Sequence, residues 1–269
     1  MHFITYELNG QEEIGLLTAD QKQIIPLLAA EHHFYGETIL PTTILSLIQQ
    51  GELALQRVKS IVKSVEAQSD LPFLLSPDNI RIVAPIPRPA KNIFCIGKNY
   101  AEHAMEGDKS ADPSVAIPKY PVIFTKAPTT VIGPGDIINS HSQVTSALDY
   151  EVELAVIIGK KASYVNKEEA MDYVFGYTIL NDVTARDLQK RHQQWFRGKS
   201  LDTTAPMGPF LVHKTSVPSV NITLEPGDII STGTPAGVGA YSTPPVFLKP
   251  GDKLELSITG LGTLINTVG

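Results

Sequence analysis

The sequence contains one cysteine, no long apolar run and no excess of basic residues, and each absence excludes a class of protein. The single Cys95 rules out an internal disulfide framework and a multi-cysteine zinc site, so a bound metal must use oxygen or imidazole ligands. The 22 basic and 28 acidic residues give a formal charge of −6, which argues against a nucleic-acid partner. Apolar runs such as Leu154–Ile158 are far shorter than the roughly 18 residues of a membrane span.

The first ten residues also lack the basic and apolar regions of a secretory signal. We therefore expect a cytoplasmic protein with no membrane partner. The chain of 269 residues is long enough for one large domain or two unequal ones, at roughly 150 residues per domain. Its 20 glycines and 20 prolines favour many short strands over a helix bundle. The composition predicts a β-rich α+β fold.

Three prolines between Ala84 and Ala90 resist both helix and central strand, and they indicate a boundary. We expect a small N-terminal domain over residues 1–84 and a larger domain over residues 85–269. In the small domain, the pattern predicts strands at 3–8, 15–18 and 23–27, with an Asn9-Gly10 hairpin turn. Apolar spacing predicts an amphipathic helix between residues 44 and 65, capped by Thr42 or Thr43 and interrupted at Gly51. The His32-His33 pair is typical of a loop.

The larger domain is predicted to be rich in strands and to contain two helices. The helices are expected at residues 167–173 and 183–196. The strands are expected at residues 92–96, 121–124, 149–158, 174–180, 209–212, 228–231 and 253–258.

Two glutamates in the segment Asp149–Gly159 are candidate metal ligands. Side chains alternate between the faces of a strand, so Glu151 and Glu153 point to the same side. Neighbouring carboxylates repel one another, which favours a bound hard cation or a raised pKa. An edge strand with a solvated acidic face would give the same spacing.

A third carboxylate follows the apolar strand predicted at residues 174–180. Asp182 lies at the end of that strand, immediately before a helical pattern, where it can serve either as a ligand or as a helix N-cap. Three oxygen ligands suit Mg²⁺ or Mn²⁺, and the sequence offers no set of soft ligands for zinc or copper.

A histidine and a glutamate follow the strand predicted at residues 92–96. His103 and Glu106 are i, i+3 neighbours if this region is helical, so the carboxylate can orient an imidazole that acts as a general base. A surface helix with an incidental ion pair is the alternative. Lys126 and Lys199 can face an anionic substrate, and the glycine-rich turn that begins at Gly233 offers backbone amides and the Thr234 hydroxyl to a carboxylate.

Six segments together resemble the fumarylacetoacetate hydrolase family, in the order in which that family carries them. They are IGKNYAEHAMEG, PVIFTKAPTTV, DYEVELAVIIGK, FGYTILNDVTARDLQ, GKSLDTTAPMGPF and LEPGDIISTGTPAGVG. The resemblance covers about residues 84–269. It is strongest to a bacterial subgroup related to the mitochondrial acylpyruvases and oxaloacetate decarboxylases.

The resemblance implies a mixed β-roll catalytic domain and a homodimer. It implies that Glu151, Glu153 and Asp182 coordinate Mg²⁺ or Mn²⁺. It also implies that His103 and Glu106 form a dyad on a helical lid. The remaining residues that it assigns are Lys126 beside the metal, and Lys199, Gln189 and Thr234 near the substrate's oxygen atoms.

The chemistry implied is an enolate formed from a small 2-oxo acid and stabilised by a divalent cation acting as a Lewis acid. Loss of CO₂ would make the protein an oxaloacetate decarboxylase, and attack by a water that His103 activates would make it an acylpyruvate or fumarylacetoacetate-type hydrolase. We expect one of these two cleavage reactions first. The alternative is a proton shuttle between carbons, which would make the protein an isomerase or tautomerase of an unsaturated dicarboxylate. A binding protein without catalysis is the fourth possibility.

One segment departs from the family pattern. Family members carry a longer connection, with a hairpin and a short helix, before the LEPGD turn. Here Pro218-Ser219-Val220 runs almost directly into that turn. The longer connection is either deleted in this protein or omitted from the sequence. None of the expected metal ligands lies in this segment.

Overall fold

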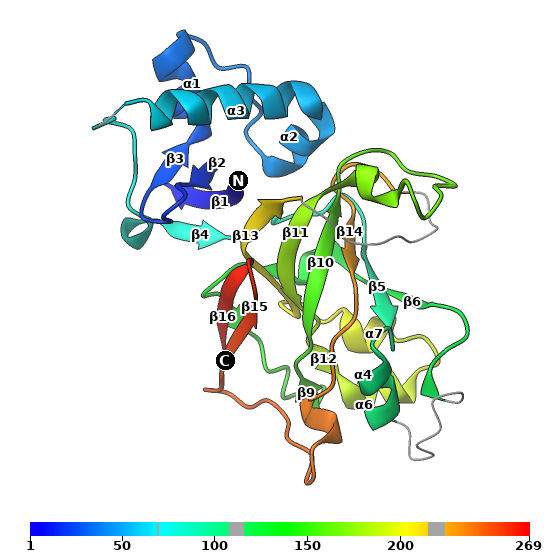
Figure 1. Ribbon diagram of the computed structural model, residues 1–269. Helices are drawn as coiled ribbons and strands as arrows, with labels where there is room; N and C mark the ends of the chain where they lie inside the picture. Colours follow the sequence, from blue (N-terminus) through cyan, green and yellow to red (C-terminus); the bar gives the residue numbers. More distant parts are fainter. Residues whose placement is uncertain (69, 108–115, 215–223) are drawn as a thin grey trace.

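A long mixed sheet forms the body of the protein. The computed structural model describes residues 1–68, 70–107, 116–214 and 224–269. Within these residues the strands of the main path lie in the order β3-β2-β1-β13-β11-β10-β14-β5-β6, and most neighbours are antiparallel (Figure 1). Their bounds are β1 (His2–Leu8), β2 (Gln11–Leu17), β3 (Ile24–Pro26), β5 (Ile93–Gly97), β6 (Val122–Lys126), β10 (Val152–Ile158), β11 (Val174–Asn181), β13 (Ala205–His213) and β14 (Ile229–Ser231).

Strands β1 and β2 form the predicted hairpin. Asn9 and Gly10 both have positive φ, at 52° and 76°, which is the conformation that a two-residue hairpin turn needs. The predicted loop at His32-His33 is wrong, because both histidines lie in helix α1 (Leu27–Tyr35). The apolar residues of this helix that are buried, Leu27 and Ala30, precede the histidine pair. The pair itself therefore shows no apolar periodicity that would predict a helix.

The predicted amphipathic helix is present as two helices. Helix α2 (Ile44–Gln50) begins at Thr43, whose hydroxyl accepts a hydrogen bond from the Ser46 N–H. Gly51, with φ of 67°, separates it from α3 (Glu52–Glu66). Both the cap at Thr43 and the interruption at Gly51 are therefore confirmed.

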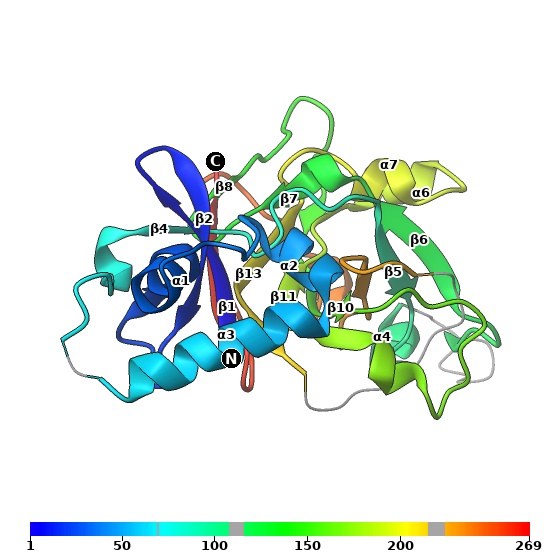
Figure 2. The ribbon, with the colours of Figure 1, turned by 90° about the horizontal axis from the view of Figure 1, so that it is seen from above.

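The N-terminal helices share a hydrophobic core with the sheet. Leu47 of α2 and Val58 of α3 belong to the same buried cluster as Ile157 of β10 and Leu211 of β13. Strand β1 also pairs directly with β13. Figures 1 and 2 show these helices at one end of the molecule, whereas α4 (Ala101–Glu106), α6 (Arg186–Arg191) and α7 (Phe196–Lys199) lie near β5 and β6. The division at residue 84 stays a prediction, which limited proteolysis can test.

Short strands and a C-terminal hairpin complete the fold. Strand β4 (Arg81–Val83) pairs with β1, and β7 (Val131–Ile132) pairs with β13. Strands β15 (Lys253–Ile258) and β16 (Gly262–Val268) form a second sheet with β8 (Ile137–Ile138). A third, very small sheet pairs β9 (Leu148–Asp149) with β12 (Thr184–Ala185).

The two helices predicted for the larger domain are shorter than expected. The first is only a 3-10 turn at Ala170–Tyr173. The second is broken, because Thr184 and Ala185 pair with β9, and helices α6 and α7 follow in turn. Gly198 brings α7 so close to α6 that a Cβ there would lie 2.5 Å from the backbone nitrogen of Gln189. No helix in the described ranges is long and apolar enough to cross a membrane.

Candidate active site

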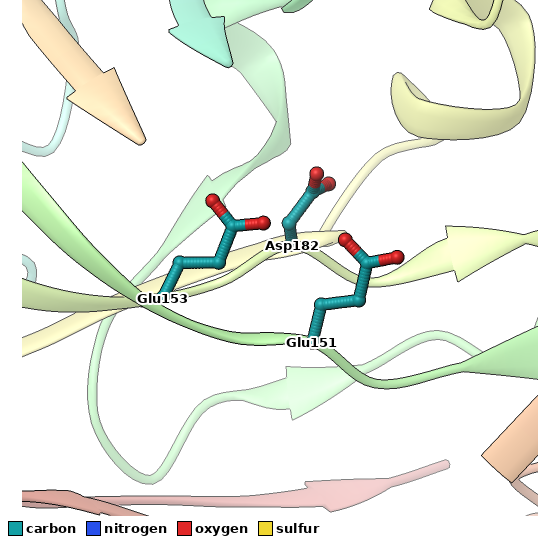
Figure 3. Close-up of side chains that lie close together, drawn as sticks. All are labelled: Glu151, Glu153 and Asp182. Carbon is teal, nitrogen blue, oxygen red and sulfur yellow. The ribbon is translucent and has the colours of Figure 1, made fainter. Parts of the chain in front are cut away.

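Three buried carboxylates converge at one end of strands β10 and β11. Glu153 is the second residue of β10 and Glu151 immediately precedes that strand, so the alternation of an extended chain directs both side chains to the same side. The backbone N–H of Asp182 donates to the carbonyl of Glu151 at 2.9 Å, which places the aspartate beside the pair. One ligand oxygen from each residue lies within 4.8 Å of the others (Figure 3). The alternative of a solvated acidic face is excluded, because all three residues are at most 5 % exposed.

Two lysine ammonium groups contact this group of carboxylates. Lys199 Nζ lies 2.8 Å from Glu151 Oε2 and 2.6 Å from Asp182 Oδ2. Lys126 Nζ lies 2.9 Å from Asp182 Oδ1 and donates to the carbonyl of Val183. Positively charged groups therefore already occupy positions next to two of the three carboxylates.

The third carboxylate has a different environment. Glu153 Oε2 accepts hydrogen bonds from the Ser231 hydroxyl and from the Gly233 N–H, and no ion pair to it is found in the described part of the chain. Its burial and its neighbours Asp182 and Glu151 raise the pKa of Glu153 well above the usual value. Burial also raises the pKa of Glu151, but Lys199 and Arg186 outweigh it and lower that pKa to about 2.

This arrangement fits a divalent cation. Repulsion between buried carboxylates is what such a cation would relieve, and an all-oxygen donor set is the kind that hard cations prefer. Oδ1 of Asp182 is buried, and apart from its ion pair with Lys126 it accepts no hydrogen bond from the described residues, so it can also face a cation. Glu151, Glu153 and Asp182 can therefore hold a metal ion.

A pocket of about 160 Å³ opens directly above the carboxylates. Glu151 and Glu153 form part of its wall, and His103 lies on the same pocket. Phe124 and Trp195, whose rings pack edge to face with centroids 5.2 Å apart, provide an apolar side. The pocket therefore combines a metal-binding group, a histidine and an aromatic wall.

The predicted dyad is formed in the structure. His103 Nδ1 lies 2.7 Å from Glu106 Oε1 on the short helix α4. The second oxygen of Glu106 accepts the N–H of Gly237 at 2.9 Å. Glu106 thus fixes the ring of His103 and also ties α4 to the glycine-rich turn. His103 lines the pocket, so this contact is not an isolated pair on a surface helix.

The other expected residues fall into two places. Gln189, Thr234 and Lys199 line the pocket, where a substrate's oxygen atoms can reach them. Lys126 is completely buried behind Asp182 and does not line the pocket. Burial lowers the pKa of Lys126, although Asp182 opposes that shift. Its position suits support of the carboxylates, as expected, and not contact with substrate.

Two charged residues of the site are absent from our sequence-based predictions. Arg186 lines the pocket and places Nη1 2.6 Å from Glu151 Oε1. Asp149 is fully buried and accepts a hydrogen bond from Arg186 Nε at 2.9 Å. Both lie close to carboxylates already identified from the sequence. Arg186 comes four residues after Asp182, and Asp149 comes two residues before Glu151. That proximity is the signal that would have found them.

The family model described as "Fumarylacetoacetate (FAA) hydrolase C-terminal" matches residues 92–222 and 218–269. The chain belongs to the fumarylacetoacetate hydrolase family. It is 44 % identical to the oxaloacetate tautomerase YisK of Bacillus subtilis, with complete coverage of both chains. It is also 37 % identical to the mitochondrial oxaloacetate tautomerase fahd2 of Xenopus laevis, over 95 % of this chain and 85 % of that protein.

Solved structures of the family share the fold. A fumarylacetoacetate hydrolase from Exiguobacterium antarcticum is 36 % identical and superimposes with a TM-score of 0.76, covering 100 % of this chain and 99 % of that one. A 2-hydroxyhepta-2,4-diene-1,7-dioate isomerase from Mycobacterium marinum is 25 % identical, with a TM-score of 0.70 and coverage of 100 % and 98 %. The α+β fold of the fumarylacetoacetate hydrolase type, expected from the sequence, is therefore confirmed.

The comparison with YisK also shows that this chain lacks some of the aligned positions. The alignment with YisK extends over 306 positions, whereas this chain has 269 residues, so at least 37 aligned positions have no counterpart here. The two matched segments of the family model meet at residues 218–222. The expected departure at Pro218–Val220 lies outside the described residues.

Proposed function

We propose that this family member is a divalent-metal-dependent tautomerase of a small 2-oxo acid, with oxaloacetate as its first candidate substrate. The observation that carries the proposal is that His103, which pairs with Glu106, lines the same pocket as Glu151 and Glu153 of the carboxylate group. The full-length similarity to proteins named as oxaloacetate tautomerases supports the choice of substrate.

Mg²⁺ or Mn²⁺ would bind to Glu151, Glu153 and Asp182. When bound, the cation would polarise the 2-oxo oxygen of the substrate and stabilise the negative charge that develops there during enolisation. Arg186, Gln189 and Thr234 would contact the carboxylate and carbonyl oxygens, since all three line the pocket. Phe124 and Trp195 would exclude water from the apolar side.

His103 would move the proton on carbon 3 of oxaloacetate. In the direction from keto to enol, its neutral ring would accept that proton, and the carbonyl oxygen would take a proton from water to become the hydroxyl of the enol. The protonated ring would then return its proton to the hydroxide that remains, so no net proton is gained or lost. In the reverse direction, the protonated ring would give a proton to carbon 3, and water would accept the proton of the enol hydroxyl and pass it back to the ring. Glu106 would stabilise the protonated ring through the 2.7 Å contact.

Cleavage of a carbon–carbon bond is the second candidate, either as decarboxylation of oxaloacetate or as hydrolysis of an acylpyruvate. The similarity to a fumarylacetoacetate hydrolase with a TM-score of 0.76 favours it, and the same site would stabilise the enolate that cleavage leaves. A homodimer and a cytoplasmic location remain predictions, and light scattering on the purified protein would test the first.

The deciding experiment follows oxaloacetate by two readings at once. Ultraviolet absorbance reports the enol, and a coupled lactate dehydrogenase reaction reports pyruvate. The tautomerase proposal expects faster enol loss with Mn²⁺ and no pyruvate beyond that formed by free Mn²⁺. Glu151→Gln and His103→Asn should both remove the acceleration. Enzyme-dependent pyruvate would establish the decarboxylase instead.

A second substrate completes the comparison. Acetylpyruvate consumed with release of acetate would establish the hydrolase. No acceleration with either substrate would contradict both proposals and leave an isomerase of an unsaturated dicarboxylate or a binding protein as the remaining possibilities.

A further inference from the structure

Asp149 is a buried carboxylate whose acceptor positions are all used. Oδ1 accepts the N–H groups of Tyr150 at 3.0 Å and Gly239 at 2.9 Å. Oδ2 accepts the N–H of Ala240 at 3.0 Å and Nε of Arg186 at 2.9 Å. The side chain is 0 % exposed and does not line the pocket. It therefore acts on the site only through the groups that it holds.

The first of these groups is the guanidinium of Arg186. Pairing of Thr184 with Asp149 between β12 and β9 brings the two residues together. While Nε is held by Asp149, Nη1 points to Glu151 Oε1 at 2.6 Å and reaches Gln189 Oε1 at 3.3 Å. A planar guanidinium fixed at one edge presents its other edge in one orientation. Arg186 lines the pocket, and its Nη1 is the atom that contacts Glu151 of the pocket wall.

The second group is the 3-10 turn Gly239–Tyr241. A Cβ at Gly239 would lie 2.8 Å from Asp149 Oδ1 and 2.1 Å from the carbonyl of Val246, so only glycine allows this close approach. The turn carries Tyr241 onto the pocket, with its ring centroid 6.0 Å from that of His103. Asp149, which is buried outside the pocket, thus contacts both Arg186 and the turn that carries Tyr241, and both of these residues line the pocket.

We propose that Asp149 is a positioning residue, which fixes Arg186 and the Gly239–Tyr241 turn against the substrate pocket. The inference rests on the proposed function only in requiring that the pocket binds a 2-oxo acid or its analogue. The rival explanation is a carboxylate that merely stabilises a turn, without effect on ligand binding.

Asp228 provides a matched control for that rival. It is 4 % exposed, its Oδ2 accepts the N–H of Glu225 at 2.8 Å, and it pairs with Lys91 Nζ at 3.2 Å. It therefore combines a buried turn carboxylate with an ion pair, as Asp149 does, but it does not line or contact the pocket.

The test compares Asp149→Asn with Asp228→Asn in the full chain. In Asp149→Asn, a side-chain NH₂ group replaces one carboxylate oxygen. It would face N–H donors that this oxygen accepts in the wild type, so those hydrogen bonds would be lost. Trp195 is the only tryptophan of the chain and lines the pocket, so its fluorescence reports binding of oxalate, a dianionic enolate analogue, in the presence of Mn²⁺. We expect Asp149→Asn to raise the Kd of oxalate roughly tenfold, the size of one lost charge-assisted hydrogen bond.

The Kd of Mn²⁺ alone should stay within about threefold of the wild-type value, because Asp149 does not belong to the three converging carboxylates. Asp228→Asn should lower Tm and leave the oxalate Kd unchanged. A combined Asp149→Asn and Arg186→Lys variant should lose less affinity than the two single losses together, since both changes disturb one guanidinium. Additive losses would overturn the role of Asp149 through Arg186.

Ala240→Pro offers a second route if Asp149→Asn fails to fold, because it removes one N–H donor and leaves the carboxylate intact. It should weaken oxalate binding in the same direction. Unchanged oxalate affinity in the variants that fold would overturn the positioning role alone. A wild-type protein that binds Mn²⁺ but not oxalate would instead count against the proposed function.

Discussion

The ammonium group of Lys199 lies 2.6 Å from Oδ2 of Asp182, inside the group of carboxylates proposed as metal ligands. Burial lowers the pKa of Lys199, but Asp182 and Glu151 outweigh it and raise that pKa above the usual value. The lysine is therefore charged and competes with a divalent cation for the same oxygens. Lys199 also lines the pocket, so an anionic substrate bound there can pair with the same ammonium group.

A bound cation should stabilise the folded protein. Mn²⁺ at 100 times its Kd would add about 2.7 kcal/mol to the free energy of unfolding. That gain should raise Tm by roughly 5–10 °C for a chain of this size. Glu153→Gln should abolish the rise, as measured by thermal unfolding with Mn²⁺ and with chelator. Glu255→Gln, which changes an exposed carboxylate on β15, should keep it. Equal rises in the two variants would contradict the metal site.

The metal-free protein should lose stability as pH rises above about 4.5. Because the pKa of Glu153 is raised in the folded chain, the folded state keeps a proton that the unfolded chain releases above the ordinary value of 4.5. The slope should approach about 1.4 kcal/mol per pH unit until the folded pKa is passed. Urea unfolding in chelator at several pH values measures it, and Glu153→Gln should flatten the curve.

Glu151 contributes with the opposite sign. Its pKa is lowered to about 2, so its stabilisation is complete above about pH 4.5 and is lost as pH falls toward 2. Glu151→Gln should remove this loss at acid pH without flattening the slope above pH 4.5. A wild-type protein whose stability rises steadily between pH 5 and 8 in chelator would contradict the assignment of Glu153.

The His103–Glu106 pair should affect turnover and not metal binding. His103→Asn should lower the rate of enol loss by about 10² to 10⁴, the usual contribution of a general base. Glu106→Gln should lower it less, because the ring remains but loses its negative partner. Both variants should keep the rise in Tm with Mn²⁺. His33→Asn, an exposed histidine on α1, is the control and should retain full activity.

Local patterns predicted those parts of the site that lie on one continuous strand or turn. Alternation along a strand was enough to place Glu151 and Glu153 on the same side. The hairpin at Asn9-Gly10 and the cap at Thr43 likewise depend on neighbouring residues only. The dyad followed from i, i+3 spacing, although the spacing alone did not show that the pair belongs to the pocket.

Contacts between distant short segments could not be predicted in the same way. Asp149 and Arg186 meet through the pairing of β9 with β12, two strands of only two residues each, which have no periodicity to detect. The same pairing broke the helix predicted at residues 183–196. There the backbone hydrogen bonds of the small sheet outweighed the local preference for a continuous helix.

Glu31 should stabilise the N-terminal helices without a role in catalysis. Its buried carboxylate accepts the N–H groups of Ile39 and Leu40 at 2.9 Å each and pairs with Arg57 Nε at 2.7 Å. Glu37, which is exposed, pairs with the same arginine. Glu31→Ala would leave two N–H groups and a guanidinium without their acceptor, at a cost of about 3 kcal/mol, whereas Glu37→Ala should cost at most about 1 kcal/mol. Urea unfolding of the two variants measures the difference, while their activity per folded molecule should match the wild type because neither residue lies on the pocket. Equal losses of stability would show that the exposed pair, and not the buried contacts, holds this helix in place.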